Sequence, residues 1–348
     1  MELNFQTYLF SMMIRPQEGC FPRGFETFLN RKTSEEQMNQ EDIKQVGVVG
    51  GGTMGFGIAI NFALWGGYPT IIQDLKESIL DQSAKQIRSS LKLFIEEDLI
   101  TPEQAKEALD KITLTTDLAE LANKSDFVTE AIVEILPDKQ KIFQDLDRLC
   151  PPHTIFVSNT SSFVVSEIGI GIGRQDKIGL THYFAPPHIV PGVEVAGTPD
   201  TSENTHEIID SLMKATNRIP IRVKKEIPGY LINRIQAAME QEALQLWSEE
   251  VATAEEIEKG IKATFGFRMP HEGPMSHYDL AGIWKWPYSA RMAPKMLNES
   301  ADPMSDKIKN RIVEGTPWFL EPENFDETVE RRDREYIRRL KTLYSELT

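Results

Sequence analysis

The chain has 348 residues, of which 53 are acidic and 38 basic, so its formal net charge is -15. This length is too great for one ordinary domain and suits two, and a hydrophobic content of 40% is enough to build sizeable cores. A negative chain without a long run of lysine and arginine would repel a phosphate backbone, so we expect no nucleic-acid partner.

Cysteine and apolar content limit the class of protein further. Cys20 and Cys150 lie far apart and outside any CxxC or zinc-like spacing, so we expect neither a disulfide framework nor a metal site. No apolar run reaches the roughly 18 to 20 residues that cross a bilayer, so no membrane association is expected. The run YLFSMMI at 8–14 lacks a basic run before it and a cleavage site after it, which argues against a secretory signal. These features favour a reducing compartment, and we expect a cytoplasmic protein.

An abrupt change of pattern at Ile43 marks the first predicted domain. The run IKQVGVVGGGTMGFGIAINFALWGGYPTIIQDL reads as strand, glycine turn, amphipathic helix and second strand, which is one βαβ unit. Helices are expected at 77–97 and 102–111, and the second opens on a capping box from Thr101 to Gln104. Residues 1–42, which precede this pattern, are expected to form an N-terminal extension.

Alternation of strands and helices continues to about residue 227. Further strands are expected at 126–130, 154–158 and 177–181, separated by helix-length intervals, which predicts a mostly parallel sheet wrapped by helices. Past Ile227-Pro228-Gly229 the pattern is helical: a long helix from Tyr230 to Trp247, another capped by Thr253 and Glu256, and a charged final helix with an apolar stripe between 329 and 347. We therefore divide the chain into the extension at 1–42, a nucleotide-binding domain at 43–227 and a helical domain at 228–348.

A glycine-rich turn joins the first predicted strand and helix. Gly50, Gly52 and Gly55 have the spacing G-x-G-x-x-G in the strand-turn-helix context that makes it informative. The first glycine permits the tight turn, the second lets backbone approach a pyrophosphate, and the third allows close helix packing. Asp74 ends the second strand, where a carboxylate accepts hydrogen bonds from an adenosine ribose and would repel a 2'-phosphate. The pattern therefore predicts NAD rather than NADP as the cofactor.

The stretch THYFAPPHIVPGVEV separates His182 from Glu194 by 12 positions and three prolines. In a purely structural interpretation the histidine ends a strand and the glutamate faces water. In a chemical one, imidazole accepts the proton of a secondary alcohol while hydride leaves for nicotinamide, and a carboxylate on the other ring nitrogen fixes the tautomer. Ser161 and Asn233 could hold the oxygen that gains charge.

Several motifs in one order resemble the L-3-hydroxyacyl-CoA dehydrogenase family, over most of residues 43–285. They are VGVVGGGTMGFGIA, TEAIVEILPDKQKIF, SNTSS, the histidine stretch, PGYLINRI and GFRMPHEGPMSHYDLAG. The resemblance implies a Rossmann-type doubly wound parallel sheet followed by an all-α domain that dimerises, with NAD-dependent oxidation of an L-3-hydroxyacyl-CoA at their junction. It implies a catalytic His182 with Glu194 as its partner, and Ser161 and Asn233 as substrate-binding residues. The cofactor-binding positions that it implies are Gly50, Gly52, Thr53, Met54, Gly55, Asp74, Glu134, Lys139 and Asn159.

Departures from the family pattern keep two alternatives open. Ala185 stands where the family's H-x-x-N-P segment has asparagine, and Glu96 and Glu97 stand where a lysine would meet the CoA phosphate, so like charges would disfavour CoA. The run PPHIVP looks more like the gulonate and carnitine dehydrogenase relatives, which oxidise free hydroxy acids. The alternatives are thus a free 3-hydroxy acid dehydrogenase and a degenerate module that binds nucleotide without turnover.

Overall fold

The computed structural model describes residues 38–270, Gly273 and Pro274, and isolated positions of the C-terminal segment, namely 327, 330, 334, 337, 338, 341, 342 and 345. The chain separates into two compact units, Met1–Met38 and Asn39–Thr348, and apart from Met38 every described residue belongs to the second. The expected extension up to residue 37 and most of the expected final helix lie outside the described residues.

One sheet of eight strands forms the centre of the described part, in the order β3-β2-β1-β4-β5-β6-β7-β8. Its strands are β1 (Val46–Val49), β2 (Thr70–Gln73), β3 (Ile112–Thr115), β4 (Phe127–Glu130), β5 (Ile155–Ser158), β6 (Ile178–Tyr183), β7 (Gly192–Gly197) and β8 (Ile219–Arg222). All neighbouring strands pair in parallel except β6 and β7, which are antiparallel. The predicted mostly parallel sheet is confirmed. The sequence did not predict β3, β7 and β8.

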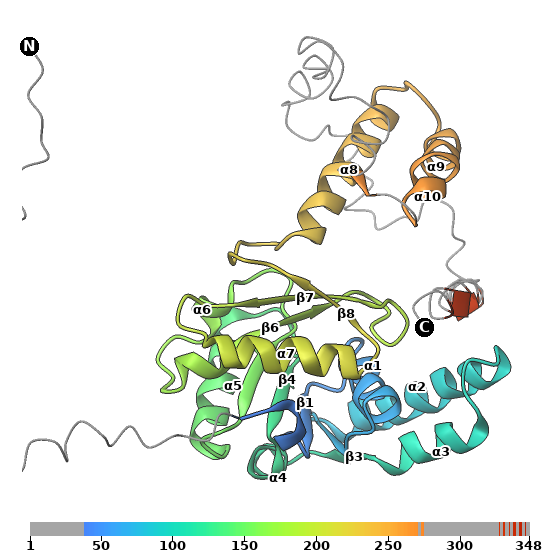
Figure 1. Cartoon of the computed structure of the whole chain (residues 1–348). Helices are drawn as coiled ribbons and strands as arrows, with labels where there is room; N and C mark the ends of the chain where they lie inside the picture. The colour runs from blue at the N-terminus through green and yellow to red at the C-terminus, as the bar shows by residue number, and fades with distance from the viewer. Residues whose placement is uncertain are drawn as a thin grey trace, which may run out of the picture. The chain divides into compact units, whose positions relative to one another are not determined.

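Helices and short helical turns connect the strands. They are η1 (Gln40–Asp42), α1 (Gly55–Ile60), the π-helical turn η2 (Asn61–Trp65), α2 (Glu77–Glu96), α3 (Pro102–Asp110), α4 (Leu118–Lys124), α5 (Leu136–Leu149), α6 (Val165–Ile168), η3 (Gln175–Lys177), α7 (Glu203–Ala215), α8 (Ile232–Ser248), α9 (Ala254–Ala263) and α10 (Phe265–Arg268). Figure 1 shows α7 running along β6 to β8, against which it packs. The expected capping box of α3 is present. The backbone N–H of Gln104 donates to Thr101 Oγ1, and the backbone N–H of Thr101 donates to Gln104 Oε1.

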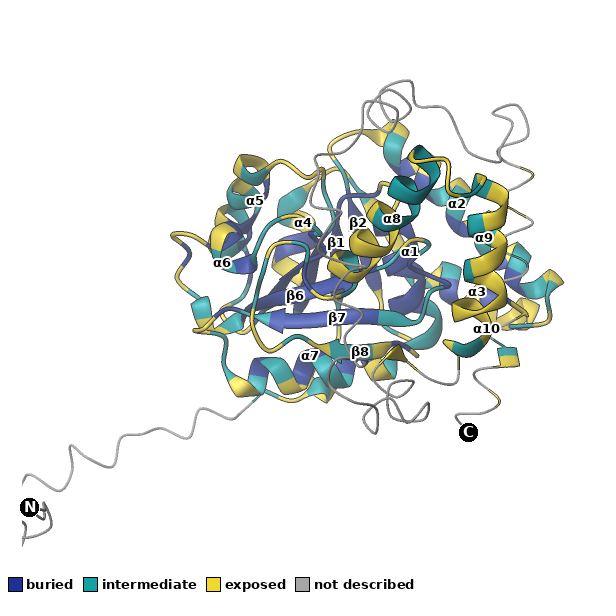
Figure 2. Cartoon of the chain, turned by 90° about the horizontal axis from the view of Figure 1, so that it is seen from above, coloured by how far each residue is buried: buried dark blue, intermediate teal, exposed yellow. Residues whose placement is uncertain are grey.

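The apolar core lies between the sheet and its helices. Strands β1, β2, β4 and β5 are buried along their whole length, as expected for central parallel strands covered on both faces. In Figure 2 β1 and β2 are dark blue, while the helices around the sheet show exposed residues in yellow. This burial fixes the strand ends, and therefore the loops that follow them, at one edge of the sheet.

The chain after β8 is helical, as the sequence predicts, through α8, α9 and α10. Thr253 Oγ1 accepts the Glu256 N–H at the start of α9, which is the expected cap. None of the residues in these three helices is buried. No helix among the described residues has both the length and the apolar character that crossing a membrane requires.

Candidate active site

A cavity of about 1020 Å³ lies at the carboxyl ends of the parallel strands, where open α/β sheets bind ligands. Its walls come from the loops after β1, β2, β4 and β5, from the end of β6 and from the start of α8. The predicted site residues that line it are Gly50, Gly52, Thr53, Met54, Asp74, Glu134, Asn159, Ser161, His182 and Asn233. The other three, Gly55, Lys139 and Glu194, are not in its lining and support residues that are.

The turn from β1 to α1 is built from glycine for three different reasons. Gly50 has a φ of +101°, and a Cβ there would lie 2.6 Å from the Ala131 carbonyl oxygen. A Cβ on Gly55 would lie 1.7 Å from the Gly50 oxygen, whereas a Cβ on Gly52 would meet no protein atom within 4 Å. Gly52 therefore leaves a concave backbone surface in the cavity that a side chain would fill. Such a surface fits the pyrophosphate of a dinucleotide.

Asp74 follows β2 and is held against the glycine turn. Its Oδ2 accepts the Gly51 N–H at 2.9 Å, and its Oδ1 accepts the Lys76 N–H at 3.3 Å. The carboxylate is thus fixed at the cavity wall, in the position from which it can accept ribose hydroxyl hydrogen bonds. With the glycine turn beside it, the residues present fit the adenosine side of NAD.

His182 and Glu194 face each other across the antiparallel strands β6 and β7, in register. His182 Nδ1 lies 2.7 Å from Glu194 Oε2, and both residues are buried. The other carboxylate oxygen, Oε1, accepts the Leu231 and Ile232 N–H groups at 2.8 and 2.7 Å, at the start of α8. An ionised carboxylate only accepts, so the ring proton sits on Nδ1 and the Nε2 lone pair is free to accept a proton. The pair therefore has the arrangement of an oriented general base.

The segment after His182 forms another part of the cavity wall. Phe184 and Ala185 line it, and the Phe184 ring centroid is 4.7 Å from that of His182. The loop is anchored on η2, since Asn61 Nδ2 donates to the Pro187 carbonyl at 2.9 Å. Because the side chain of Ala185 is a methyl group, this part of the wall offers no hydrogen bond from that position.

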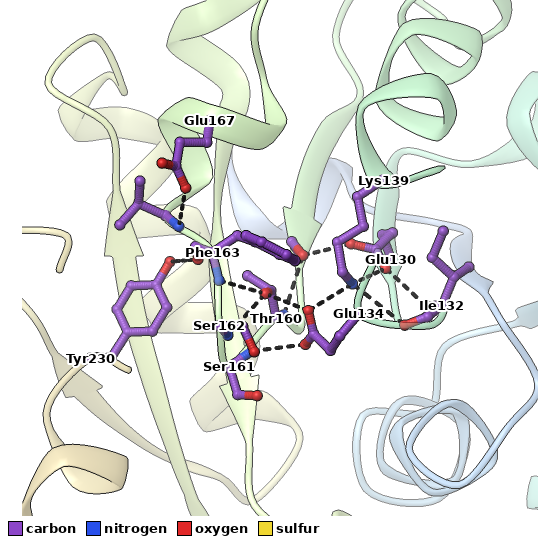
Figure 3. A network of polar contacts seen from close by, with 12 residues as sticks. Glu130, Ile132, Glu134, Lys139, Thr160, Ser161, Ser162, Phe163, Glu167 and Tyr230 are labelled. Carbon is purple, nitrogen blue, oxygen red and sulfur yellow. Dashed lines mark hydrogen bonds and ion pairs between the residues drawn. The ribbon is translucent and has the colours of Figure 1, made fainter. Parts of the chain in front are cut away.

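Ser161 lies in a turn after β5 that the β4–α5 loop holds (Figure 3). Glu134 Oε1 accepts the Ser161 N–H, and its Oε2 accepts the Thr160 hydroxyl proton, both at 2.9 Å. Asn159, at the end of β5, accepts the Tyr183 N–H with Oδ1 at 2.9 Å and so ties the β5 end to β6. Asn233 reaches the cavity from the first turn of α8.

Lys139 lies behind Glu134 instead of facing the cavity. Its Nζ is 2.7 Å from Glu130 Oε1 and 3.7 Å from Glu134 Oε2, and Lys139 and Glu130 are both fully enclosed. Ser158 donates to the other Glu130 oxygen at 2.5 Å. Sequence reasoning did not select Glu130 or Ser158, although each closes a strand, β4 and β5, at the ligand-binding edge of the sheet. Both residues thus contact Glu134 indirectly, through Lys139.

The acidic pair at the end of α2 has partners that the sequence did not predict. Arg334 donates to Glu96 Oε2 at 2.8 Å and to Glu97 Oε1 at 3.1 Å, and Arg338 Nε lies 3.3 Å from Glu97 Oε2. The expected repulsion of CoA assumed two uncompensated carboxylates. Both carboxylates are therefore paired with positive charge. Arg334 lies 238 positions after Glu96 in the sequence.

Comparison with known proteins gives the same family over most of the chain. A family model described as 3-hydroxyacyl-CoA dehydrogenase, NAD binding domain, matches residues 45–227, and one for the C-terminal domain matches 229–315. Human mitochondrial hydroxyacyl-coenzyme A dehydrogenase is 36% identical over 246 residues, covering 69% of this chain and 77% of that protein. The 3-hydroxybutyryl-CoA dehydrogenase of Clostridioides difficile is 31% identical over 239 residues, covering 69% and 83%.

A solved structure extends the likeness to three dimensions. The (S)-3-hydroxybutyryl-CoA dehydrogenase of Ralstonia eutropha superposes with a TM-score of 0.63 at 30% identity, covering 78% of this chain and 94% of that one. The chain belongs to the 3-hydroxyacyl-CoA dehydrogenase family.

Proposed function

We propose that this protein is an oxidoreductase that interconverts an L-3-hydroxyacyl-CoA and the corresponding 3-ketoacyl-CoA with NAD as the cofactor. The observation that carries the proposal is the buried His182–Glu194 pair, in which His182 lines a cavity with a dinucleotide-type glycine turn. Family membership supports the reaction class, because the relatives are named for hydroxyacyl-CoA and 3-hydroxybutyryl-CoA.

In the proposed mechanism His182 moves the proton. Its Nε2 accepts the proton of the substrate hydroxyl, and the positive ring is stabilised by Glu194, 2.7 Å from Nδ1. When bound, NAD supplies the acceptor for the hydride that leaves the carbinol carbon. In the reverse direction the charged ring returns its proton to the oxygen.

Ser161 and Asn233 are the proposed ligands of the substrate oxygen. Both line the cavity with His182, and a hydroxyl and an amide can donate to an oxygen that becomes negative during reduction of the ketone. The cofactor would be held by the glycine turn, including Thr53 and Met54, by Asp74, and on the nicotinamide side by Glu134 and Asn159. Gly55 and Lys139 contribute indirectly, through the turn and through Glu134.

Assembly and compartment are further parts of the proposal. We place the protein in the cytoplasm because it has only two cysteines and Cys150 is a free, buried thiol. We also propose a homodimer formed through the helical domain, because apolar side chains on α8 to α10 are exposed. Among them are Ile235 on α8 and Phe265 and Phe267 on α10, at 53%, 46% and 77%.

A substrate panel tests the reaction. Purified protein with NAD is offered short and medium chain 3-hydroxyacyl-CoA thioesters and the matching free 3-hydroxy acids, each as both enantiomers, and NADH is followed by absorbance. We expect NADH only with the L-thioesters. Turnover of the free acids alone would replace this function with a hydroxy acid dehydrogenase, and NAD binding with no turnover would indicate a degenerate nucleotide-binding module.

A further inference from the structure

We infer that Tyr230 is a positioning residue, which holds the turn that carries Ser161 at its working distance from His182. The inference rests on the proposed function, since it assumes that a substrate contacts Ser161 and His182 together. Tyr230 is not in the lining of the cavity, so it would act through these two residues.

The side chain of Tyr230 lies near His182 and contacts the turn that carries Ser161. It is fully buried, and its ring centroid lies 6.1 Å from that of His182. Its hydroxyl donates to the carbonyl oxygen of Phe163 at 2.9 Å, two residues after Ser161 (Figure 3). Burial raises the pKa of the Tyr230 phenol, so the hydroxyl keeps its proton and remains a donor over the working pH range.

The turn is thus held at both ends, and at its beginning Ser158 Oγ accepts the Thr160 N–H at 3.2 Å. Glu134 binds its beginning through the Thr160 hydroxyl and the Ser161 N–H. Within the turn, Thr160 Oγ1 accepts the N–H groups of Ser162 and Phe163 at 3.2 and 3.1 Å. Tyr230 holds the end, from the segment between β8 and α8. Figure 3 shows Glu134 and Tyr230 on opposite sides of the turn.

The backbone beside Tyr230 holds the catalytic pair. Gly229 and Tyr230 have φ values of +76° and +46°, the left-handed region that a bulky side chain rarely adopts. This bend directs the next two N–H groups, of Leu231 and Ile232, onto Glu194. Three consecutive residues therefore contact the serine turn through a hydroxyl and the carboxylate through amides.

Loss of the hydroxyl should affect the geometry of the reaction more than binding of the cofactor. A shift of about 1 Å at a substrate-positioning residue can lower a rate by roughly 100-fold. The Tyr230→Phe substitution keeps the ring beside His182 and removes the hydroxyl, with its hydrogen bonds to the backbone of Phe163 and Val165. The Glu194 contacts, which come from the backbone, remain.

A matched control is Thr154→Val. Thr154 is buried at the amino end of β5, away from the cavity-lining edge, and its hydroxyl donates to the Ser125 carbonyl at 2.8 Å. The two substitutions each remove one buried hydroxyl that is bound to a backbone carbonyl. Any general loss of stability from such a bond should therefore appear in both variants.

The experiment combines steady-state kinetics with hydrogen exchange of the ligand-free proteins. For Tyr230→Phe we expect kcat with L-3-hydroxybutyryl-CoA to fall roughly 10- to 100-fold. The KM for NAD should stay within about 2-fold, and the pH profile should keep its shape, because the His182–Glu194 pair is unaltered. Amide exchange in residues 160–164 should accelerate. Thr154→Val should keep wild-type kcat and wild-type exchange in this segment.

Two results would overturn the inference. Wild-type kcat together with unchanged exchange at 160–164 in Tyr230→Phe would show that the hydroxyl does not hold the turn. Equal losses of kcat in Tyr230→Phe and Thr154→Val would show that the Tyr230 hydroxyl contributes only to general stability. If the wild-type protein oxidises no 3-hydroxyacyl-CoA, the proposed function fails separately, while the exchange comparison still decides whether Tyr230 holds the turn.

Discussion

At the scale of residues, the candidate site depends on the groups that donate hydrogen bonds to the Glu194 carboxylate. The sequence, through its resemblance, supplied His182 and Glu194 as a pair. It did not indicate that β6 and β7 place them directly opposite, or that Leu231 and Ile232 donate to the second carboxylate oxygen. Those facts depend on the pairing of a strand with a segment rich in proline and on a bend at Tyr230, which are tertiary properties.

Cys150 provides a prediction at this scale. Burial raises the pKa of its thiol to about 12, so the thiolate that reacts with iodoacetamide is scarce at about pH 9 in the folded protein. We expect alkylation of Cys150 only after unfolding in urea, as followed by peptide mass. Because the unfolded thiol ionises first, the free energy of unfolding should also fall as the pH rises above about 9. Fast labelling of the native protein would show that the thiol is accessible and ionised.

At the scale of elements, the sequence predicted the long helices and the buried central strands but missed the strands β3, β7 and β8. β3 and β8 have partly exposed side chains and lie at the two edges of the sheet, so they lack a continuous apolar pattern. β8 also contains Pro220, a residue that marks an edge strand and lowers any strand prediction. The glycine turn was predictable because local backbone conformation and close packing explain why glycine stands at its three positions.

Two glycines of that turn should respond differently to alanine. In Gly55→Ala the new Cβ would collide with the Gly50 oxygen at 1.7 Å, so the free energy of unfolding should fall by about 3 kcal/mol or more. In Gly52→Ala nothing of the protein lies within 4 Å, and stability should stay within about 0.5 kcal/mol. The Kd for NAD should nevertheless rise at least about 10-fold, because the methyl group occupies the cofactor surface. Urea unfolding and NAD titration measure the two effects. Unchanged NAD affinity in Gly52→Ala would remove the turn from the cofactor site.

At the scale of the whole molecule, the helical domain contributes to the site and presents apolar surface. Asn233 and Gln236 reach the cavity from α8, while Ile235 and Met239 on the same helix are 53% and 41% exposed. Helix α8 has no buried residue. Most helices in proteins gain their stability by packing an apolar face against a neighbour. A second copy of the chain is the partner that we propose for this surface.

Light scattering after size exclusion tests that assembly. We expect twice the mass of one chain for the wild type. Met239→Glu should shift the population toward the monomer, because an unpaired charge would be buried in the interface. A monomeric wild-type protein at micromolar concentration would contradict the homodimer.

The most direct test of the central claim is the turnover of Glu194→Gln with an L-3-hydroxyacyl-CoA. The glutamine oxygen can still accept the two α8 amides, but its NH₂ group would donate to His182 Nδ1 and move the ring proton to Nε2, where no base remains. We predict that kcat falls roughly 100-fold or more, while NAD affinity and the circular dichroism spectrum stay as in the wild type. Wild-type kcat in this variant would contradict the assignment of His182 and Glu194 as the catalytic base and its partner.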